Sequence, residues 1–221
     1  ESISLCDDGG FIIGGAEINY TGSTNFTRPL VMKVDSNGTR VWHRMFGSSI
    51  HTNMPAYGVT QTPNGYAFVG AVGLPHWGGI SDGGYSPWIV GLDSMGSMIW
   101  ADTNTPDQAA STWSNHYSDI ELLDDGSMVI TGQRNIWDSA NTGTAKFRNH
   151  GIMAKYGMNG EQKWIRQYRH PEVPDEWSSN HLLFDVDPTP DGGFVAAGWL
   201  SPSDDNTQDT WMIKVDSFGC L

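Results

Sequence analysis

The stretch "VMKVDSNGTRVWHRMFG", residues 31–47, decides the fold because variants of it return along the chain. The later copies read "IVGLDSMGSMIW" at 89–100, "IMAKYGMNGEQKW" at 152–164 and "WMIKVDSFGCL" at 211–221. Each copy carries a short apolar run and then a turn that ends in Gly, and the first three copies add a Trp after the turn. Self-similarity of this kind predicts a repeat architecture, in which each unit buries its apolar face against the next.

A second repeated phrase precedes each of these stretches. It reads "ISLCDDGGFIIGG" at 3–15, "GVTQTPNGYAFVG" at 58–70, "IELLDDGSMVITG" at 120–132 and "VDPTPDGGFVAAG" at 186–198. The apolar runs are rich in β-branched and aromatic residues, which suit strands, and the connectors supply residues that accept positive φ in tight turns. Each repeat is therefore predicted to contain four short antiparallel strands, formed by two hairpins.

Four-stranded sheets stacked radially are the blades of a β-propeller. We therefore predict an all-β fold, with one β-propeller domain over 1–221 built from four antiparallel four-stranded blades. The repeats run approximately over 1–47, 57–104, 118–168 and 184–221. The fourth copy stops before its Trp, so the last blade is predicted to lack its outer strand in this chain. A three-stranded blade, a piece of a larger chain and a strand donated by another subunit all remain open.

The Trp that closes each complete copy is predicted to be structural, filling the wedge between neighbouring blades. These residues are Trp42, Trp100 and Trp164. In the turn before the Trp, Gly157 stands where the other copies have Asp. The Asp residues at that position are therefore predicted to stabilise the turn through their side chains, and they are Asp35, Asp93 and Asp216.

The pattern "DGGF" followed by "K-x-D-x-x-G-x-x-x-W" resembles the DGG-type propeller repeats of secreted and surface proteins from Bacteroidota-like bacteria. It is more distantly similar to quinoprotein-type propeller repeats and to the Asp-box hairpins of sialidases. The resemblance covers nearly the whole chain and implies the propeller fold. It brings no quinone-site signature and no catalytic residue.

The composition excludes some partners. Only 12 Lys and Arg face 25 Asp and Glu, which gives this acidic protein a net charge of −13. A groove for nucleic acid needs clustered basic residues, and the sequence has none, so we expect no nucleic acid partner. No apolar run reaches the roughly 20 residues of a membrane helix, so no membrane span is expected. The Gly-rich, Trp-rich and acidic composition suits an extracellular or cell-surface protein.

The strand order predicts that the two ends of the propeller differ. One end carries only tight turns and is called the plain end, and the other carries the long connections that are candidates for ligand binding. The tight turns share one end, and long connections share the other, at 16–29, 71–87, 133–150 and 199–210 within blades and at 48–56, 101–117 and 169–181 between them. These connections are rich in Trp and His beside Asn, Asp and Ser, which suits stacking on a sugar ring. The candidate ligand contacts are His76, Trp77, Trp113, His116, Trp137, Trp177 and Trp199. Packing of the loops onto the blades, or contact with another subunit, would also account for them.

Two of the innermost strands are predicted to carry pairs of carboxylates toward the central channel. Asp119 is equivalent to Asp185, and Glu121 is equivalent to Asp187. Residues i and i+2 of a strand point the same way. The other two blades offer Ser2 and Ser4, and Tyr57 and Val59, at these positions.

The four acids have several possible roles. Close acids raise one another's pKa, bind a cation such as Ca²⁺, or serve as the carboxylates of a glycosidase. Solvated acids in a water-filled channel are the simplest alternative. The seven His show no metal-ligand spacing, so no transition-metal site or other cofactor is predicted.

Cys6 and Cys220 both lie at the predicted plain end, in blades one and four. In a ring of four these blades are neighbours, and a disulfide would staple the chain ends together, whereas the separation of inner and outer strands opposes it. Our first hypothesis is a secreted or surface non-catalytic propeller that binds a glycan or a protein through its long loops. The alternatives are a polysaccharide-active enzyme that uses the channel acids and a structural subunit that self-associates through its fourth blade.

Overall fold

The computed structural model describes residues 1–21, 24–47, 54–73, 84–103, 115–138, 146–173, 179–201 and 207–221. These residues form fifteen strands and no helix, so the all-β prediction is confirmed. Within the same ranges there is accordingly no helix with the length and apolar character needed to cross a membrane.

Blades one and two are separate four-stranded antiparallel sheets. The strands of blade one are β1 (Ser2–Leu5), β2 (Phe11–Thr21), β3 (Thr24–Val34) and β4 (Arg40–Met45). The strands of blade two are β5 (Gly58–Thr62), β6 (Gly65–Gly73), β7 (Tyr85–Leu92) and β8 (Met98–Thr103). In each sheet the strands lie in sequence order, as the two-hairpin reading predicts.

Blades three and four share a short bridge. The strands of blade three are β9 (His116–Leu122), β10 (Met128–Asp138), β11 (Lys146–Tyr156) and β12 (Gln162–Tyr168). The strands of blade four are β13 (Asn180–Pro188), β14 (Phe194–Ser201) and β15 (Asp209–Val215). A single parallel pairing of Asn149 with Asn180 joins the two blades into one seven-stranded sheet.

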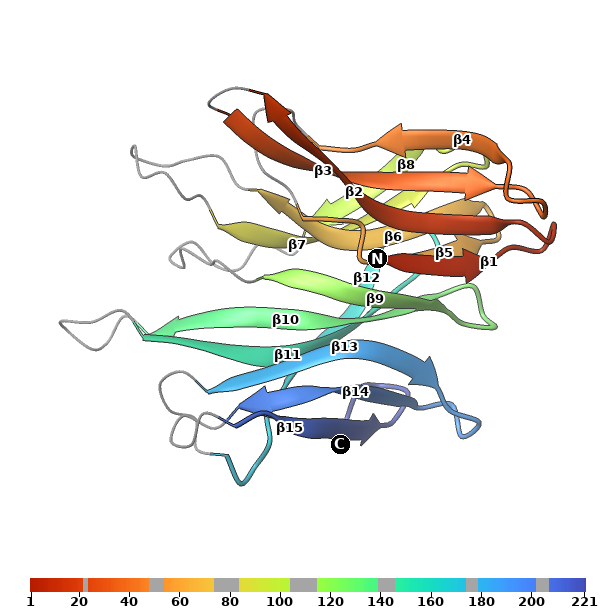
Figure 1. Ribbon diagram of the computed structural model, residues 1–221. Coiled ribbons are helices and arrows are strands. Elements are labelled where there is room, and N and C mark those ends of the chain that lie inside the picture. The colour runs from red at the N-terminus through yellow and green to blue at the C-terminus, as the bar shows by residue number, and fades with distance from the viewer. Residues whose placement is uncertain are drawn as a thin grey trace.

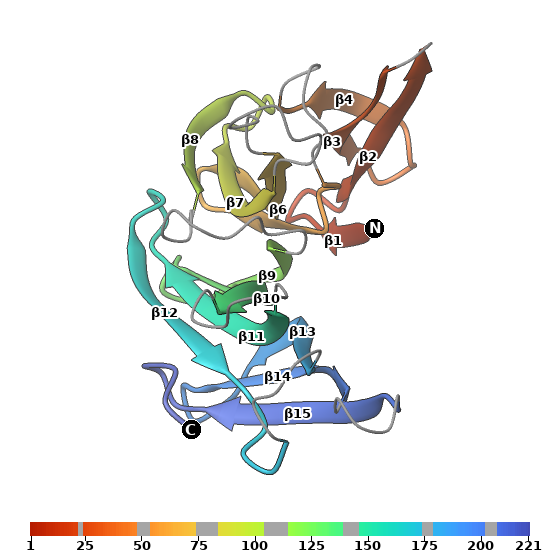
Figure 2. The same ribbon diagram turned by 90° about the vertical axis from the view of Figure 1, so that its left-hand side faces the viewer.

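The blades stack in chain order, and the tight hairpin turns of all four lie at one end of the stack (Figure 1). The inner strands β1, β5, β9 and β13 contact one another in that order. The stack follows an open arc, and the two ends of the chain lie far apart (Figure 2). The architecture is therefore propeller-like, and closure into a ring of four is not observed among the described residues.

The predicted turn chemistry is confirmed. A Gly with positive φ lies in each tight hairpin turn, at Gly9, Gly38, Gly65, Gly96, Gly126, Gly160, Gly192 and Gly219. In the turn of blade one, Asp35 Oδ1 accepts hydrogen bonds from the backbone N–H groups of Asn37 and Thr39, at 2.9 and 2.8 Å. The equivalent Asp residues of blades two and four make the same pair of bonds.

The outer-strand Trp residues lock each blade to the next, as predicted. Trp42, Trp100 and Trp164 each cover the turn Gly of the following blade. A Cβ on those glycines would lie 2.5–2.9 Å from the ring, closer than any real contact, at Gly96, Gly160 and Gly219. Trp42 also donates a hydrogen bond from Nε1 to the Ser94 carbonyl of blade two, at 3.1 Å. Each Trp ring therefore requires a residue without a side chain at the turn position that it covers in the following blade.

Two expectations about the chain ends and loops are wrong. Residues 16–29 were expected to be a loop, yet β2 and β3 stay paired out to Thr21 and Thr24. A cross-strand ion pair between Arg28 and Glu17, at 2.6 Å, supports this extension.

The expected disulfide is also absent. Cys6 is a buried free thiol in blade one, and Cys220 is an exposed free thiol in blade four. The staple needs blades one and four to be neighbours, and the open arc separates them (Figure 2).

Candidate functional site

The inner strands of blades three and four carry the four predicted acids. β9 pairs Tyr117 with Gly132 and then Asp119 with Thr131, so the intervening residue forms a bulge. β13 has the same irregularity one residue before Asp185. Bulges redirect the side chains next to them. The matching bulges explain why Asp119 and Asp185 occupy equivalent positions.

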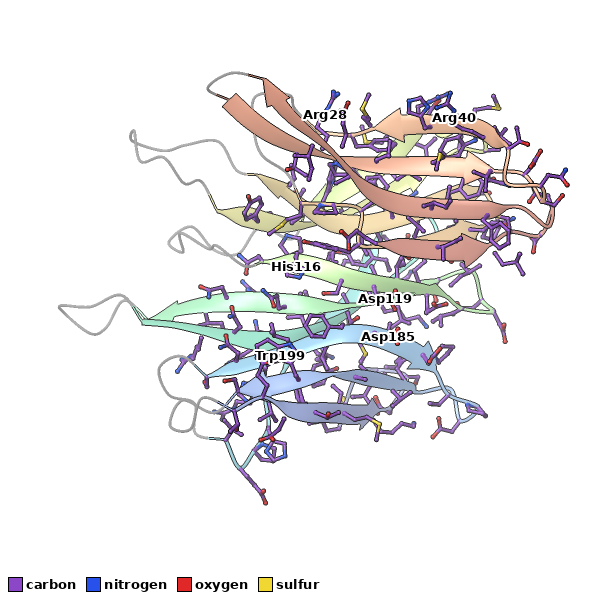
Figure 3. The ribbon with its side chains drawn as sticks, in the orientation of Figure 1. Arg28, Arg40, His116, Asp119, Asp185 and Trp199 are labelled. Carbon is purple, nitrogen blue, oxygen red and sulfur yellow. The ribbon has the colours of Figure 1, made fainter. Side chains whose placement is uncertain are left out.

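Asp119 reaches across from blade three to blade four. Its Oδ2 accepts a hydrogen bond from the backbone N–H of Val186, at 3.2 Å. The nearby carboxyl group of Asp185 also interacts with it and raises its pKa. Figure 3 shows the two residues on the facing strands β9 and β13. The inner strands of these blades are thus joined by an acid–acid contact.

The protonation of this pair follows from its surroundings. Burial is the main cause that raises the pKa of Asp119 to about 7, and Asp185 adds to it through its hydrogen bond and its charge. Two backbone N–H donors oppose the rise. Burial also raises the pKa of Glu121, helped by the charges of Asp187 and Asp185. Asp119 is therefore a carboxyl group whose pKa lies well above its ordinary value, mainly because it is buried.

Blades one and two do not extend the acid cluster. In blade two the first turn is one residue shorter, because Thr62 pairs directly with Gly65. Register therefore places Gly58 and Thr60 at the acid positions, and not Tyr57 and Val59 as the sequence alignment predicted. A Cβ on Gly58 would lie 2.9 Å from Asp119 Cα, so the backbones of the two blades approach closely there.

Two hydroxyl groups beside Asp119 are left without a hydrogen-bond partner among the described residues. They are Thr131 Oγ1, directly opposite Asp119, and Ser118 Oγ in the bulge. Thr131 is fully buried. Buried polar groups are normally satisfied, so these hydroxyls fit a site that bound water or a polar ligand completes. Across the described ranges, no three His, Cys, Asp or Glu side chains gather closely enough to hold a metal ion.

Exposed aromatic rings adjoin the exposed acids of blade four. Phe184, the bulge residue before Asp185, is 43% exposed. Its ring lies 6.4 Å from the ring of the half-buried Trp199 on β14, tilted by 46°. Asp185 and Asp187 are both exposed beside it. Among the predicted ligand contacts, Trp199 is the one on the strand next to β13, where its ring contacts that of Phe184; Figure 3 labels Trp199 and the two acids.

His116 is placed differently from the other candidates. It begins β9, and its ring centroid lies 5.2 Å from that of Tyr57. Burial lowers the pKa of His116 to about 4, so the ring is neutral at physiological pH. Its Nδ1 atom is buried and has no hydrogen-bond partner in the described part of the chain.

The remaining loop candidates are not described. Trp137 lies in β10, but its side chain is outside the described residues. The other four also lie outside them, and they are His76, Trp77, Trp113 and Trp177.

A ladder of asparagines connects blades two, three and four and was not predicted. Asn115 Nδ2 donates to the Tyr85 carbonyl of blade two, at 3.1 Å, and Asn115 Oδ1 accepts from the Asn135 N–H at 2.7 Å. Asn135 Nδ2 donates to Asn149 Oδ1 at 2.9 Å, and Asn149 in turn donates to Asn180 Oδ1. The available signal was the tripeptide Ser-Asn-His, which occurs at 114–116 and again at 179–181.

Comparisons with known proteins show a fold and no family. No family model matches the chain, and no curated protein matches it. Among solved structures, the chain is similar to MPT-4, a mannose phosphorylase from Leishmania mexicana determined in complex with phosphate ion. The TM-score is 0.50 and the identity 12%, over 97% of this chain and 66% of that chain. The chain thus spans about two thirds of the phosphorylase, with which it shares a propeller-like fold.

Proposed function

We propose that this chain is a secreted or cell-surface protein that binds a glycan and does not transform it. The described part of the binding surface is the inner edge of blades three and four. The observation that carries the proposal is that the exposed acids Asp185 and Asp187 share strand β13 with the exposed Phe184, whose ring lies 6.4 Å from that of Trp199.

The chemistry of this surface suits a sugar. Carboxylate oxygens accept hydrogen bonds from hydroxyl groups, and Asp185 and Asp187 present theirs to solvent. Aromatic rings cover the C–H face of a pyranose while polar neighbours bind its hydroxyls. We extend the proposal to the loop candidates of the sequence analysis, which lie outside the described residues.

The spacing of the acids supports binding over hydrolysis. Glycosidases hold their two carboxyl groups roughly 5–5.5 Å apart to retain configuration, or about 6.5–9.5 Å apart to invert it. Asp185 acts directly on Asp119, whose pKa it helps to raise. We therefore propose that the pair acts as a shared acceptor and donor at the edge of the site, and not as the two separated carboxyl groups of a glycosidase.

The test titrates the full chain with a panel of soluble oligosaccharides and measures binding by tryptophan fluorescence and by calorimetry. We expect Trp199→Ala or Phe184→Ala to weaken binding about three- to ten-fold, from the loss of ring contact. Asp185→Asn should weaken it about ten-fold or more, from the loss of a charged acceptor. Phe218→Ala is the matched control, since Phe218 is 68% exposed in the turn that follows β15 and is not part of the proposed surface. Equal loss in the control, or no saturable binding to any glycan, would refute the proposal.

A second candidate function is acid catalysis on a glycoside, favoured by one observation. Asp119 has a pKa of about 7, and a carboxyl group that stays protonated near neutral pH suits a general acid. The test incubates the chain with oligosaccharides with and without inorganic phosphate and measures reducing ends and sugar phosphates. Turnover that Asp119→Asn abolishes, with sugar binding retained, would replace the binding proposal with this one.

A further inference from the structure

The acids of the inner strands have no basic partner among the described residues. They are Asp119 and Glu121 on β9 and Asp185 and Asp187 on β13. The ion pairs of the described residues use other carboxylates, those of Asp8, Glu17, Asp125, Glu161 and Asp191. Burial raises the pKa of Asp119 and of Glu121, and the charged groups that add to the rise are themselves carboxylates, of Asp185 and Asp187. Within the described ranges, the negative charge of this inner edge is therefore not compensated.

The acids remain at the edge of the sheet where a following blade packs against it. Glu121 pairs with Val129, whose side chain lies in the apolar core between blades three and four. Asp119 accepts a hydrogen bond from the backbone of Val186 in blade four. Both acids nevertheless stay partly exposed. Contact with a neighbouring blade thus leaves inner-strand acids of this position within reach of a ligand.

A buried hydroxyl group beside the acids also indicates a ligand. Thr131 is fully buried, and its Oγ1 atom has no hydrogen-bond partner among the described residues. Thr131 lies directly opposite Asp119 in the pairing of β9 with β10, so its side chain projects from the same face of the sheet as the Asp119 carboxyl group. A buried hydroxyl group without a partner is destabilising. Thr131 therefore offers a donor and an acceptor to a polar group that enters beside Asp119.

We propose that the inner edge of blades three and four selects glycans that carry ammonium groups, such as oligomers of glucosamine. The inference rests on the glycan-binding function proposed above and names the chemical class of the sugar. The ammonium groups bind the carboxylates of the four acids, and a polar group of the sugar reaches the Thr131 hydroxyl. Phe184, which directly precedes Asp185, covers a ring face of the sugar.

The arrangement of the acids favours several ammonium groups over a neutral sugar or one metal ion. Residues two apart on a strand are separated by about 6.7 Å, whereas Ca²⁺ holds its oxygen ligands at about 2.3–2.6 Å. Hydrogen bonds between ammonium and carboxylate groups are stronger than those between neutral groups. A neutral sugar leaves the repulsion among the acids in place, whereas an amino sugar relieves it. The charge of the ligand is therefore the property that this edge discriminates.

The first experiment compares two sugars with the same ring skeleton, of which only one carries charge. A glucosamine tetramer and its fully N-acetylated form are titrated into the full chain by calorimetry at pH 6 and low ionic strength. We expect the amine form to bind about ten-fold more tightly, because its ammonium groups meet carboxylates. The preference should shrink when salt is raised to about 0.5 M, because salt screens partly exposed charges.

The second experiment uses variants to find the groups that recognise the charge. Glu121→Gln and Asp187→Asn each remove one charge and should weaken binding of the amine form about three- to ten-fold, with little effect on the acetylated form. Glu172→Gln is the matched control, because Glu172 is exposed between β12 and β13 and lies outside the acid edge. Thr131→Val should weaken binding of the amine form about three-fold, whereas the unbound variant should be at least as stable as the wild type, because the hydroxyl group that it loses has no partner.

The outcomes separate this inference from the function on which it rests. Binding of both sugars without preference for the amine form would overturn the inference and leave glycan binding intact. An equal loss in Glu172→Gln would also overturn it, since the net charge of the chain would then attract the ligand. Displacement of the amine form by millimolar Ca²⁺ at constant ionic strength would make a metal ion the occupant. A failure of every glycan to bind would refute both proposals.

Discussion

The interface between blades one and two and the interface between blades three and four use different chemistry on the same scaffold. The first is an aromatic cluster, in which the Phe68 ring lies 4.8 Å from Phe46 and 5.6 Å from Trp88. The second has an apolar core as well, but polar groups bridge it, through the Asp119–Asp185 contact and the Asn149–Asn180 contact.

The difference teaches how repeated blades acquire distinct roles. Burial is non-directional, so an apolar interface tolerates small shifts and does not depend on pH. Hydrogen bonds between buried polar groups need a defined geometry. Removing one partner leaves the other buried without a hydrogen bond, which destabilises the fold. We therefore expect the first interface to supply stability, and the second to fix the relative position of the blades that carry the proposed sugar site.

The largest expected effect is at the first interface. Phe68 is fully buried, and Phe68→Ala should destabilise the protein by about 3–5 kcal/mol through lost burial and the cavity left behind. Chemical denaturation at pH 5 and pH 8 should give the same loss. A loss that changes with pH would contradict the apolar description of this interface, and Phe218→Ala serves as the exposed control.

The next prediction compares alanine substitutions at two turn glycines, of which only one contacts a Trp ring. Gly38 and Gly96 have φ of +80° and +79°, but a Cβ at Gly38 meets nothing within 4 Å, whereas one at Gly96 would lie 2.8 Å from Trp42. Gly38→Ala should cost about 1–2 kcal/mol from backbone strain alone. Gly96→Ala should cost about 1–3 kcal/mol more, because the ring must move. Equal losses in thermal denaturation would mean that the ring does not lock the blades.

The asparagine ladder at the second interface provides the third prediction. Asn149→Ala removes the acceptor of Asn135 and the donor to Asn180, and should cost about 2–3 kcal/mol because buried polar groups lose their partners. We also expect faster amide hydrogen exchange at the start of β13. Asn37→Ala, in an exposed turn, is the control and should change neither measurement.

The smallest expected effect is a pH dependence at the acid pair. The folded-state pKa of Asp119, about 7, exceeds its ordinary value of 3.8, so the folded protein binds more protons between these values. Stability contributed by Asp119 therefore falls as the pH rises from about 4 to about 7. Asp119→Asn lacks this loss and should be more stable than the wild type by about 1–2 kcal/mol at pH 8.

The difference in unfolding free energy between the wild type and Asp119→Asn, measured at each pH, cancels the contributions of the other titrating groups. His116, with a pKa lowered to about 4, acts in the opposite direction, since its stabilising contribution is lost as the pH falls from 6.5 toward 4. It is present in both proteins and cancels in the difference. A wild-type to Asp119→Asn difference that stays constant from pH 4 to pH 8 would show that the carboxyl group is not buried.

Local chemistry made much of the fold predictable. The turn glycines and the Asp35 hydrogen bonds follow from short-range backbone requirements, and the Trp42 contact follows from the repeat itself. The equivalent strand positions of Asp119 and Asp185 also follow from the repeat, and the two residues interact. These features depend on a few adjacent residues and on the repetition of a unit.

The features that were not predicted depend on how the blades pack against one another and on single-residue changes in turn length, which the repeat pattern does not specify. Whether the arc closes depends on how each blade is rotated against the next, so the sequence left the Cys6–Cys220 disulfide open, and both residues are free thiols in the structure. One residue fewer in the blade-two turn moved Gly58 into the place assigned to Tyr57. The asparagine ladder was missed because its members lie far apart in sequence, from Asn115 to Asn180, and join only once the blades are stacked.

The Trp contact runs in one direction along the chain. Trp42 belongs to blade one and needs Gly96 of blade two, and Trp164 belongs to blade three and needs Gly219 of blade four. During synthesis from the N-terminus, each ring emerges before the turn that receives it, so a finished blade waits for its successor with one aromatic group uncovered. We therefore expect the blades to assemble in chain order during synthesis, with the turn of each new blade covering the Trp ring of the blade before it.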